Sequence, residues 1–302
     1  MEIKSLIDYY NTNIKPKVFL QELLCEKNKF YILYIYDYEK ELDNFRETYL
    51  NYLPFYIKNE DKLITLEDNG ELSEQLEKRT RNIENGDSIL PKRSSKVNGL
   101  FGELFLDFYL RIVRKRKLII TYASKRPFDS NYETTGPDNL VYGFDENHRL
   151  HVYFCEAKFV EGKDNAENSL LNDINGSSKK EAHVCKKYIN KYIQFVIDKK
   201  DDIDDIDKEY FKEFLEKAND QLQTNIDFVS LLKQEHICVD FVFFAIFDSD
   251  FKESSKFKNE YKNIYDACNS QVKIMGLEDT SIEVVFIPVD NKPLFIKEEM
   301  VK

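Results

Sequence analysis

The chain has 302 residues and a formal net charge of −11 at pH 7. Its five cysteines are widely spaced and include no C-x-x-C pair, which argues against a disulfide framework and fits a reducing cytoplasm. No stretch approaches the ~18 apolar residues of a membrane span, and no G-x-x-x-x-G-K-[ST] motif is present. We therefore expect a cytoplasmic protein that neither spans a membrane nor hydrolyses nucleoside triphosphates itself.

The first of two predicted domains covers residues 1–95. Aromatic and aliphatic residues dominate 29–38, which predicts a strand, and residues 39–53 predict a helix. A polar stretch then leads into a predicted linker at 91–98. We interpret this region as a regulatory or partner-docking domain. Its aromatic run could stack bases, but aromatic residues that alternate in a strand usually pack in a core.

The second predicted domain, residues 96–302, opens with a helix over 97–110. Its apolar residues follow the i, i+3, i+4 spacing of a buried face, and Asn98 is the expected N-cap. Glu103 lies at the border of that face, as either a site acid or an ordinary surface glutamate. A basic cluster follows, which suits phosphate contacts or a helix C-terminus equally well: Arg111, Arg114, Lys115, Arg116 and Lys117.

After a strand at 118–122, residues 138–145 and 149–159 predict an antiparallel hairpin closed by a three-residue loop. Counting back from that loop places Asp138 directly opposite Glu156. A two-residue loop would instead turn Asp138 to the other face of the sheet. Glu156 and Lys158 share one face because side chains on a strand alternate with period two.

Asp138, Glu156 and Lys158 are the residue types that a metal-dependent phosphodiesterase needs. Carboxylates whose Cβ atoms are about 4.5–5.5 Å apart can share one divalent cation, and hard oxygen ligands suit Mg²⁺ or Mn²⁺. Lys158 could hold or deprotonate the attacking water, or neutralise charge in the transition state.

Each of these residues also has an ordinary structural interpretation. Glu156 and Lys158 could form an ion pair on a solvated strand, and Asp138 could be a turn residue after Gly136-Pro137. The strand is apolar on both faces, however, which predicts a central position in the sheet. Buried charge is costly without a metal or a partner, so an active site is favoured.

The segments after the hairpin combine helices, strands and polar connections. Residues 162–178 are expected to form a loop bordering the site, and an acidic turn at 199–205 is interpreted as solvated. The four histidines, His148, His151, His183 and His236, are dispersed and show no zinc-binding spacing. Helices are predicted at 179–199, 208–217, 219–233 and 252–275, and strands at 236–247 and 281–289.

The predicted elements from residue 97 to residue 159 follow the order helix, strand, strand, strand. They contain Gly102-Glu103, Gly136-Pro137-Asp138 and Glu156-Ala157-Lys158-Phe159. This combination of element order and residues resembles the PD-(D/E)xK nuclease superfamily. More narrowly, the chain resembles the HamA family, the effector subunit of Hachiman antiphage defence, which works with a superfamily 2 helicase. The resemblance implies an α/β (mixed α+β) fold with a restriction-endonuclease-like core, its mixed central sheet flanked by helices, after an N-terminal α+β domain.

The resemblance further implies a Mg²⁺-dependent (or Mn²⁺-dependent) deoxyribonuclease that cleaves DNA and is held in check by its helicase partner. It makes Asp138 and Glu156 metal ligands, Lys158 the catalytic lysine and Glu103 a supporting acid. The net negative charge predicts weak binding of free DNA, as suits a substrate delivered by a helicase. Two alternatives stay open, a non-catalytic nucleic-acid-binding or inhibitory subunit with this fold, and an RNA-cleaving nuclease.

Overall fold

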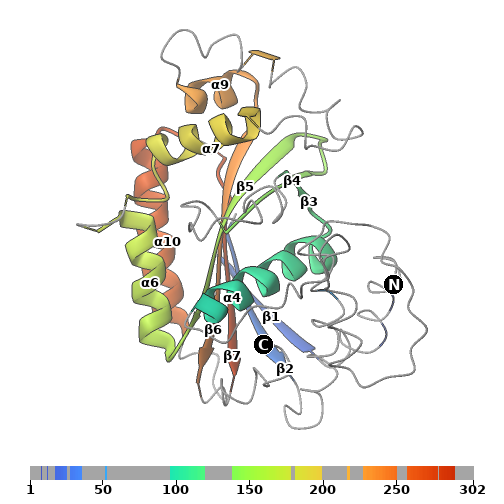
Figure 1. The fold of residues 1–302 in the computed structure, drawn as a ribbon, viewed down its shortest axis with the longest axis vertical. Coiled ribbons are helices and arrows are strands. Elements are labelled where there is room, and N and C mark those ends of the chain that lie inside the picture. The colour runs from blue at the N-terminus through green and yellow to red at the C-terminus, as the bar shows by residue number, and fades with distance from the viewer. Residues whose placement is uncertain are drawn as a thin grey trace, which may run out of the picture.

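A mixed sheet lies at the centre of the protein, with helices on both of its faces (Figure 1). The computed structural model describes residues 18–25, 28–35, 96–119, 138–177, 181–198, 227–249, 257–277 and 279–289, with isolated positions at 8, 12, 52, 216 and 217. Within these residues, no helix has the length and apolar character needed to cross a lipid bilayer.

Five strands form the core of the sheet, and three of them run parallel. Their spatial order is β7 (Ile282–Val289), β6 (Cys238–Asp248), β5 (Leu150–Val160), β4 (Asn139–Phe144) and β3 (Lys117–Leu118). The parallel strands are β5, β6 and β7, while β4 is antiparallel to both β5 and β3. The hairpin β1 (Val18–Cys25) and β2 (Asn28–Ile35) extends this sheet, with β2 parallel to β7.

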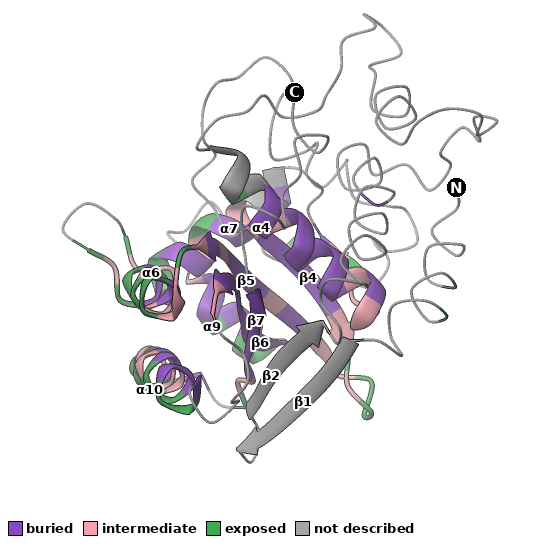
Figure 2. Cartoon of the chain, turned by 90° about the horizontal axis from the view of Figure 1, so that it is seen from below, coloured by how far each residue is buried: buried purple, intermediate pink, exposed green. Residues whose placement is uncertain are grey.

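Helices cover the two faces unequally. One face packs against α4 (Lys96–Phe108), which the π-helix η2 (Tyr109–Val113) continues. The other face forms a large core with α6 (Lys163–Asn175), α7 (Lys186–Asp198), α9 (Phe228–Gln234) and α10 (Lys258–Ile274). Figure 2 shows the strands β5, β6 and β7 buried between these layers, with the outward sides of α6 and α10 exposed. Parallel strands that are buried on both faces need continuous apolar sequence, which explains the predicted strands at 236–247 and 281–289.

The predicted three-residue hairpin loop is confirmed. The Asp145 amide donates a hydrogen bond to the Arg149 carbonyl at 3.1 Å, and His148 has a φ of 60°. A turn that ends in one residue of left-handed conformation is a common solution for three-residue hairpin loops. The loop fixes the register of β4 against β5, because a slip of one residue would reverse every side chain.

That register is the one the sequence predicted for the hairpin. Asn139, the first residue of β4, pairs with Cys155 of β5. Continuing the same register by one residue places Asp138 opposite Glu156. The predicted order of helix, strand, strand, strand is also present as α4, β3, β4 and β5.

The prediction of a loop at 162–178 was wrong, because most of this segment forms α6. Asparagine and aspartate are common in this segment and disfavour helix interiors, so the sequence did not suggest a helix. Ala166, Leu170 and Ile174 nevertheless recur every four residues, and all three are buried in the large core. Tertiary burial of this apolar stripe outweighs the weak helix propensity.

Several predicted boundaries also differ from the structure. Asn98 lies inside α4 rather than at its N-cap, and the helix expected from residue 179 begins only at Lys186. The predictions at 39–53, 199–205 and 208–217 lie largely outside the described residues, as do Pro91 to Ser95 of the linker. The division into two domains at residue 95 stays a prediction.

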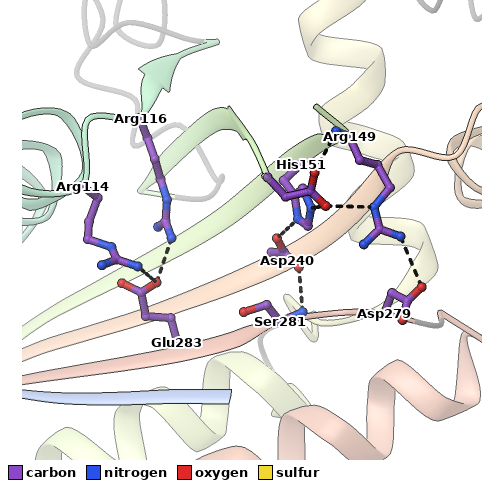
Figure 3. Close-up of polar contacts among 9 residues, drawn as sticks. Arg114, Arg116, Arg149, His151, Asp240, Asp279, Ser281 and Glu283 are labelled. Carbon is purple, nitrogen blue, oxygen red and sulfur yellow. Dashed lines mark hydrogen bonds and ion pairs between the residues drawn. The ribbon is translucent and has the colours of Figure 1, made fainter. Parts of the chain in front are cut away.

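Figure 3 shows two ion-pair networks that join the strands, one around Asp145 and Asp240 and one around Glu283. At the start of the parallel strands, His151 Nδ1 is 2.6 Å from an Asp240 oxygen, and the Ser281 amide donates to the other Asp240 oxygen at 2.6 Å. Beside it, Arg149 lies 3.3 Å from both Asp145 and Asp279. These contacts tie the hairpin loop to β6 and to the residues that precede β7.

Candidate active site

Asp138 is held against β5 at the point where β4 begins. Its Oδ2 accepts a hydrogen bond from the Ala157 amide at 2.6 Å. The carboxylate therefore takes the place that a backbone carbonyl would occupy if the ladder continued past Asn139. This contact places Asp138 beside the Glu156-Ala157-Lys158 segment.

Glu156 is 4% exposed, and two aromatic side chains hold it in place. The Tyr188 hydroxyl donates to Oε1 at 2.9 Å, and His183 Nδ1 lies 2.7 Å from the same oxygen. The His183 and Tyr188 rings stack with their centroids 4.3 Å apart. The residues around α7 therefore orient the Glu156 carboxylate from one side.

Lys158 lies between carboxylates. Its ammonium forms an ion pair with Asp173 of α6 and is 4.0 Å from Glu156 Oε2. Asp173 is only 1% exposed. Burial alone would lower the pKa of Lys158, but the charges of Asp138, Glu156 and Asp173 outweigh it and raise the pKa above its ordinary value. The Lys158 ammonium therefore keeps its charge at neutral pH.

The two aromatic partners of Glu156 also respond to its charge. Burial would lower the pKa of His183, but the hydrogen bond to Glu156, its charge and that of Asp173 raise it, with Lys158 opposing. Burial and the Glu156 charge raise the pKa of Tyr188, so its hydroxyl stays protonated and remains a donor.

Three carboxylates, those of Asp138, Glu156 and Asp173, gather around Lys158 among the residues that the structure describes. A divalent cation would offset part of their charge. The arrangement fits metal binding, since one ligand atom from each of Glu156, Asp173 and His183 lies within 4.8 Å of the others.

A second group of carboxylates, with one oxygen of each within 4.8 Å of the others, lies where α6 and α10 pack together. It consists of Asp164, Glu167 and Glu260. The Lys163 ammonium already pairs there with Glu260 and lies 3.2 Å from Asp164, which is exposed. This group is therefore the weaker candidate for a metal ion.

Glu103 comes from the other side of the sheet. It is half-buried on α4, where a methyl group added to neighbouring Gly102 would lie 3.5 Å from Phe159 Cβ. The Phe159 side chain points away from the face that carries Glu156 and Lys158. The structure thus brings Asp138, Glu156 and Lys158 together, whereas a role for Glu103 as a supporting acid stays a prediction.

Sequence reasoning missed Asp173, His183 and Tyr188. Asp173 lies in the segment that was predicted to be a loop, and the dispersed histidines match no zinc-binding spacing. One signal was available for Asp173, which lies three residues after Leu170 and one before Ile174 on the buried stripe of α6. A charged residue on an apolar helix face needs a partner.

The guanidinium groups of the basic cluster face inward. Arg114 and Arg116 lie 3.4 and 2.7 Å from Glu283, a buried carboxylate on β7 (Figure 3). Burial would raise the pKa of Glu283, but Arg116 and Arg114 outweigh it and lower the pKa. Arg111 lies 3.7 Å from Asp107. These contacts favour a structural role for the three arginines over phosphate contacts.

The fold and the site define a mixed α/β protein with a buried site of carboxylates and one lysine, centred on a parallel strand. The HamA family model matches residues 9–302, so the chain belongs to the HamA family. This confirms the resemblance drawn from the sequence and extends it to most of the first 95 residues. Family membership suggests a component of the Hachiman defence system. None of the curated proteins matches the chain.

Proposed function

We propose that this protein is the nuclease effector of a Hachiman defence system, with a PD-(D/E)xK core that hydrolyses phosphodiester bonds in DNA. The observation that carries the proposal is the convergence of Asp138, Glu156 and Lys158 in one site at the end of β4 and on β5. The HamA family match supports the biological setting, in which a superfamily 2 helicase holds the effector in check and acts with it.

Asp138 and Glu156 would hold Mg²⁺ or Mn²⁺ in this proposal. When bound, the ion supplies charge stabilisation at the scissile phosphate and lowers the pKa of water. The charged Lys158 ammonium offsets negative charge that develops on the phosphate oxygens. Tyr188 keeps the Glu156 carboxylate oriented by donating to one of its oxygens. Residues 1–95 would supply the regulatory or partner-docking surface.

One observation favours the second candidate, a non-catalytic binding or inhibitory subunit. Glu156 and Lys158 already have partners within the protein, namely Tyr188 and His183 for the carboxylate and Asp173 for the ammonium. An active site that has lost its catalytic activity would retain such internal contacts. The same contacts would also suit an effector that is inactive until its partner releases it.

The test is cleavage of plasmid DNA with Mg²⁺, comparing wild type with Glu156→Gln and Lys158→Met, each with and without the helicase and ATP. We expect cleavage by wild type only, with each substitution lowering the rate about a hundredfold or more. Glu146→Gln is the matched control, because Glu146 is exposed in the hairpin loop.

The remaining outcomes separate the candidates. Undiminished cleavage by either site variant would refute the site assignment. Cleavage of RNA but not of DNA would identify an RNA-cleaving nuclease. Binding of either nucleic acid without cleavage, under all conditions, would support the non-catalytic subunit.

A further inference from the structure

We propose that Glu156, Asp173 and His183 form a metal site for a first-row transition ion of the Mn²⁺ type, and that the Lys158 ammonium occupies the Asp173 carboxylate until that ion binds. This inference deepens the proposed nuclease function and rests on it, because it names the cation chemistry of the same site. It differs from the ligand pair Asp138 and Glu156, since it adds an imidazole and a carboxylate that the hairpin motif does not contain.

Three separate segments bring the ligands together. Glu156 comes from β5, Asp173 from α6, and His183 from the residues just before α7. One ligand atom from each lies within 4.8 Å of the other two, and both carboxylates are at least 95% buried. A group of this kind, in which an imidazole joins two buried carboxylates, is unlike the exposed acidic clusters that are common on protein surfaces.

Contacts outside the ligand atoms hold the site in shape. The His183 amide donates to the Asp173 carbonyl at 2.6 Å, which ties the segment before α7 to the end of α6. The Tyr188 ring stacks on the imidazole, and its hydroxyl donates to Glu156. Supporting contacts that fix the orientation of ligands are typical of metal sites.

Lys158 shares the Asp173 carboxylate with the proposed metal site. Its ammonium pairs with Asp173, and a cation bound there would compete for the same carboxylate. Binding of the ion would release the ammonium from Asp173, leaving it available to offset charge on a phosphate. We therefore expect the Lys158 ammonium to lower the affinity of the site for the ion. In cleavage, the released ammonium and the ion would both offset charge on the phosphate.

The imidazole decides the class of ion. Mg²⁺ prefers oxygen ligands and retains several waters, whereas imidazole nitrogen suits first-row transition ions. Two carboxylates and one imidazole therefore favour a first-row transition ion over Mg²⁺, and Mn²⁺ is the member of that class that carboxylate ligands also suit. His183 is the residue that distinguishes this site from one built of Asp138 and Glu156 alone.

The decisive measurement is electron spin echo envelope modulation spectroscopy of the full-length protein loaded with Mn²⁺. In the wild type we expect nitrogen coupling, that is, hyperfine coupling between the Mn²⁺ electron spin and an imidazole nitrogen. Labelling with ¹⁵N-histidine should change this coupling, and His183→Gln should remove it. His151→Gln is the matched control, because His151 binds Asp240 away from the site, and it should retain the coupling. The labelled wild type needs no substitution, so the result does not depend on a variant that folds poorly.

The affinity for Mn²⁺ tests whether Lys158 and the ion compete for Asp173. It is measured by a titration that follows the electron paramagnetic resonance signal of unbound Mn²⁺. Asp173→Asn should weaken binding by about 10- to 100-fold, while Lys158→Met should tighten it by about tenfold. A wild-type protein that binds Mn²⁺ without nitrogen coupling, or Lys158→Met protein that binds it no tighter, would overturn the inference.

Metal binding and cleavage are measured separately, so the metal-site inference and the nuclease proposal can be overturned independently. Mg²⁺-dependent cleavage without nitrogen coupling would leave the nuclease and remove this ligand set. Nitrogen coupling without cleavage of DNA or RNA would leave the metal site and remove the nuclease.

Discussion

Glu156 receives a hydroxyl donor and an imidazole on one carboxylate oxygen, while its other oxygen faces the Lys158 ammonium at 4.0 Å. A carboxylate held from two sides loses little orientational freedom on binding a cation. At the scale of single residues, the Tyr188 hydroxyl and the His183 imidazole fix the orientation of the Glu156 carboxylate.

His151 makes a testable contribution to stability at this scale. Its hydrogen bond to Asp240, followed by the charges of Asp240 and Asp145, raises its pKa above 6.5 although burial opposes the shift. A group whose folded pKa lies above its unfolded value stabilises the fold fully below the unfolded pKa, about 6.5. That stabilisation is lost as pH rises through the folded pKa.

We therefore expect the free energy of unfolding of the wild type, relative to His151→Gln, to fall as pH rises above about 6.5. Urea denaturation of both proteins at a series of pH values measures this difference. A difference that grew with pH, or stayed constant across the series, would contradict the assignment.

At the scale of elements, α6 supplies both a core face and a site residue. Leu170 and Ile174 are fully buried against the sheet, and Asp173 lies between them on the helix surface, where it reaches Lys158. Packing of the apolar stripe therefore positions the carboxylate. Loss of the stripe should disturb the site as well as the fold.

Leu170→Ala tests the packing of α6. The substitution leaves a cavity in a closely packed core, so we expect the free energy of unfolding to fall by about 2–5 kcal/mol. Asn172→Ala, at an exposed position on the same helix, should change it by no more than about 0.5 kcal/mol. Equal effects of the two substitutions in urea denaturation would show that the helix does not pack as described.

At the scale of the whole molecule, the net charge of −11 opposes association with a polyanion. Three arginines of the basic cluster are engaged by Asp107 and Glu283, which limits their use for phosphate contacts. Non-specific affinity for DNA comes mainly from phosphate neutralisation by lysine and arginine. A protein of this charge should depend on a partner to bring the substrate to its site.

The isolated protein should therefore bind duplex DNA weakly, with an affinity that changes little between about 50 and 200 mM salt. Fluorescence anisotropy with a labelled duplex at several salt concentrations measures both properties. Strong binding with a steep salt dependence would show that a basic surface is available to DNA, and would remove the need for delivery by a helicase.

Local patterns in the sequence were sufficient for the hairpin and the parallel strands. The alternation of side chains placed Glu156 and Lys158 on one face, and the loop length placed Asp138 opposite Glu156; the pairing of Asn139 with Cys155 confirms that register. These features depend on neighbours in the chain and on the period of a strand, so they can be read from the residues alone.

Only the tertiary structure decided the rest of the site. α6 is helical because its apolar stripe is buried, not because its residues favour a helix, and this burial brings Asp173 to Lys158. His183 reaches Glu156 from 27 positions along the chain, through the packing of α6 and α7 on one face of the sheet. Contacts between distant segments arise from packing, which the local pattern of residue types does not encode.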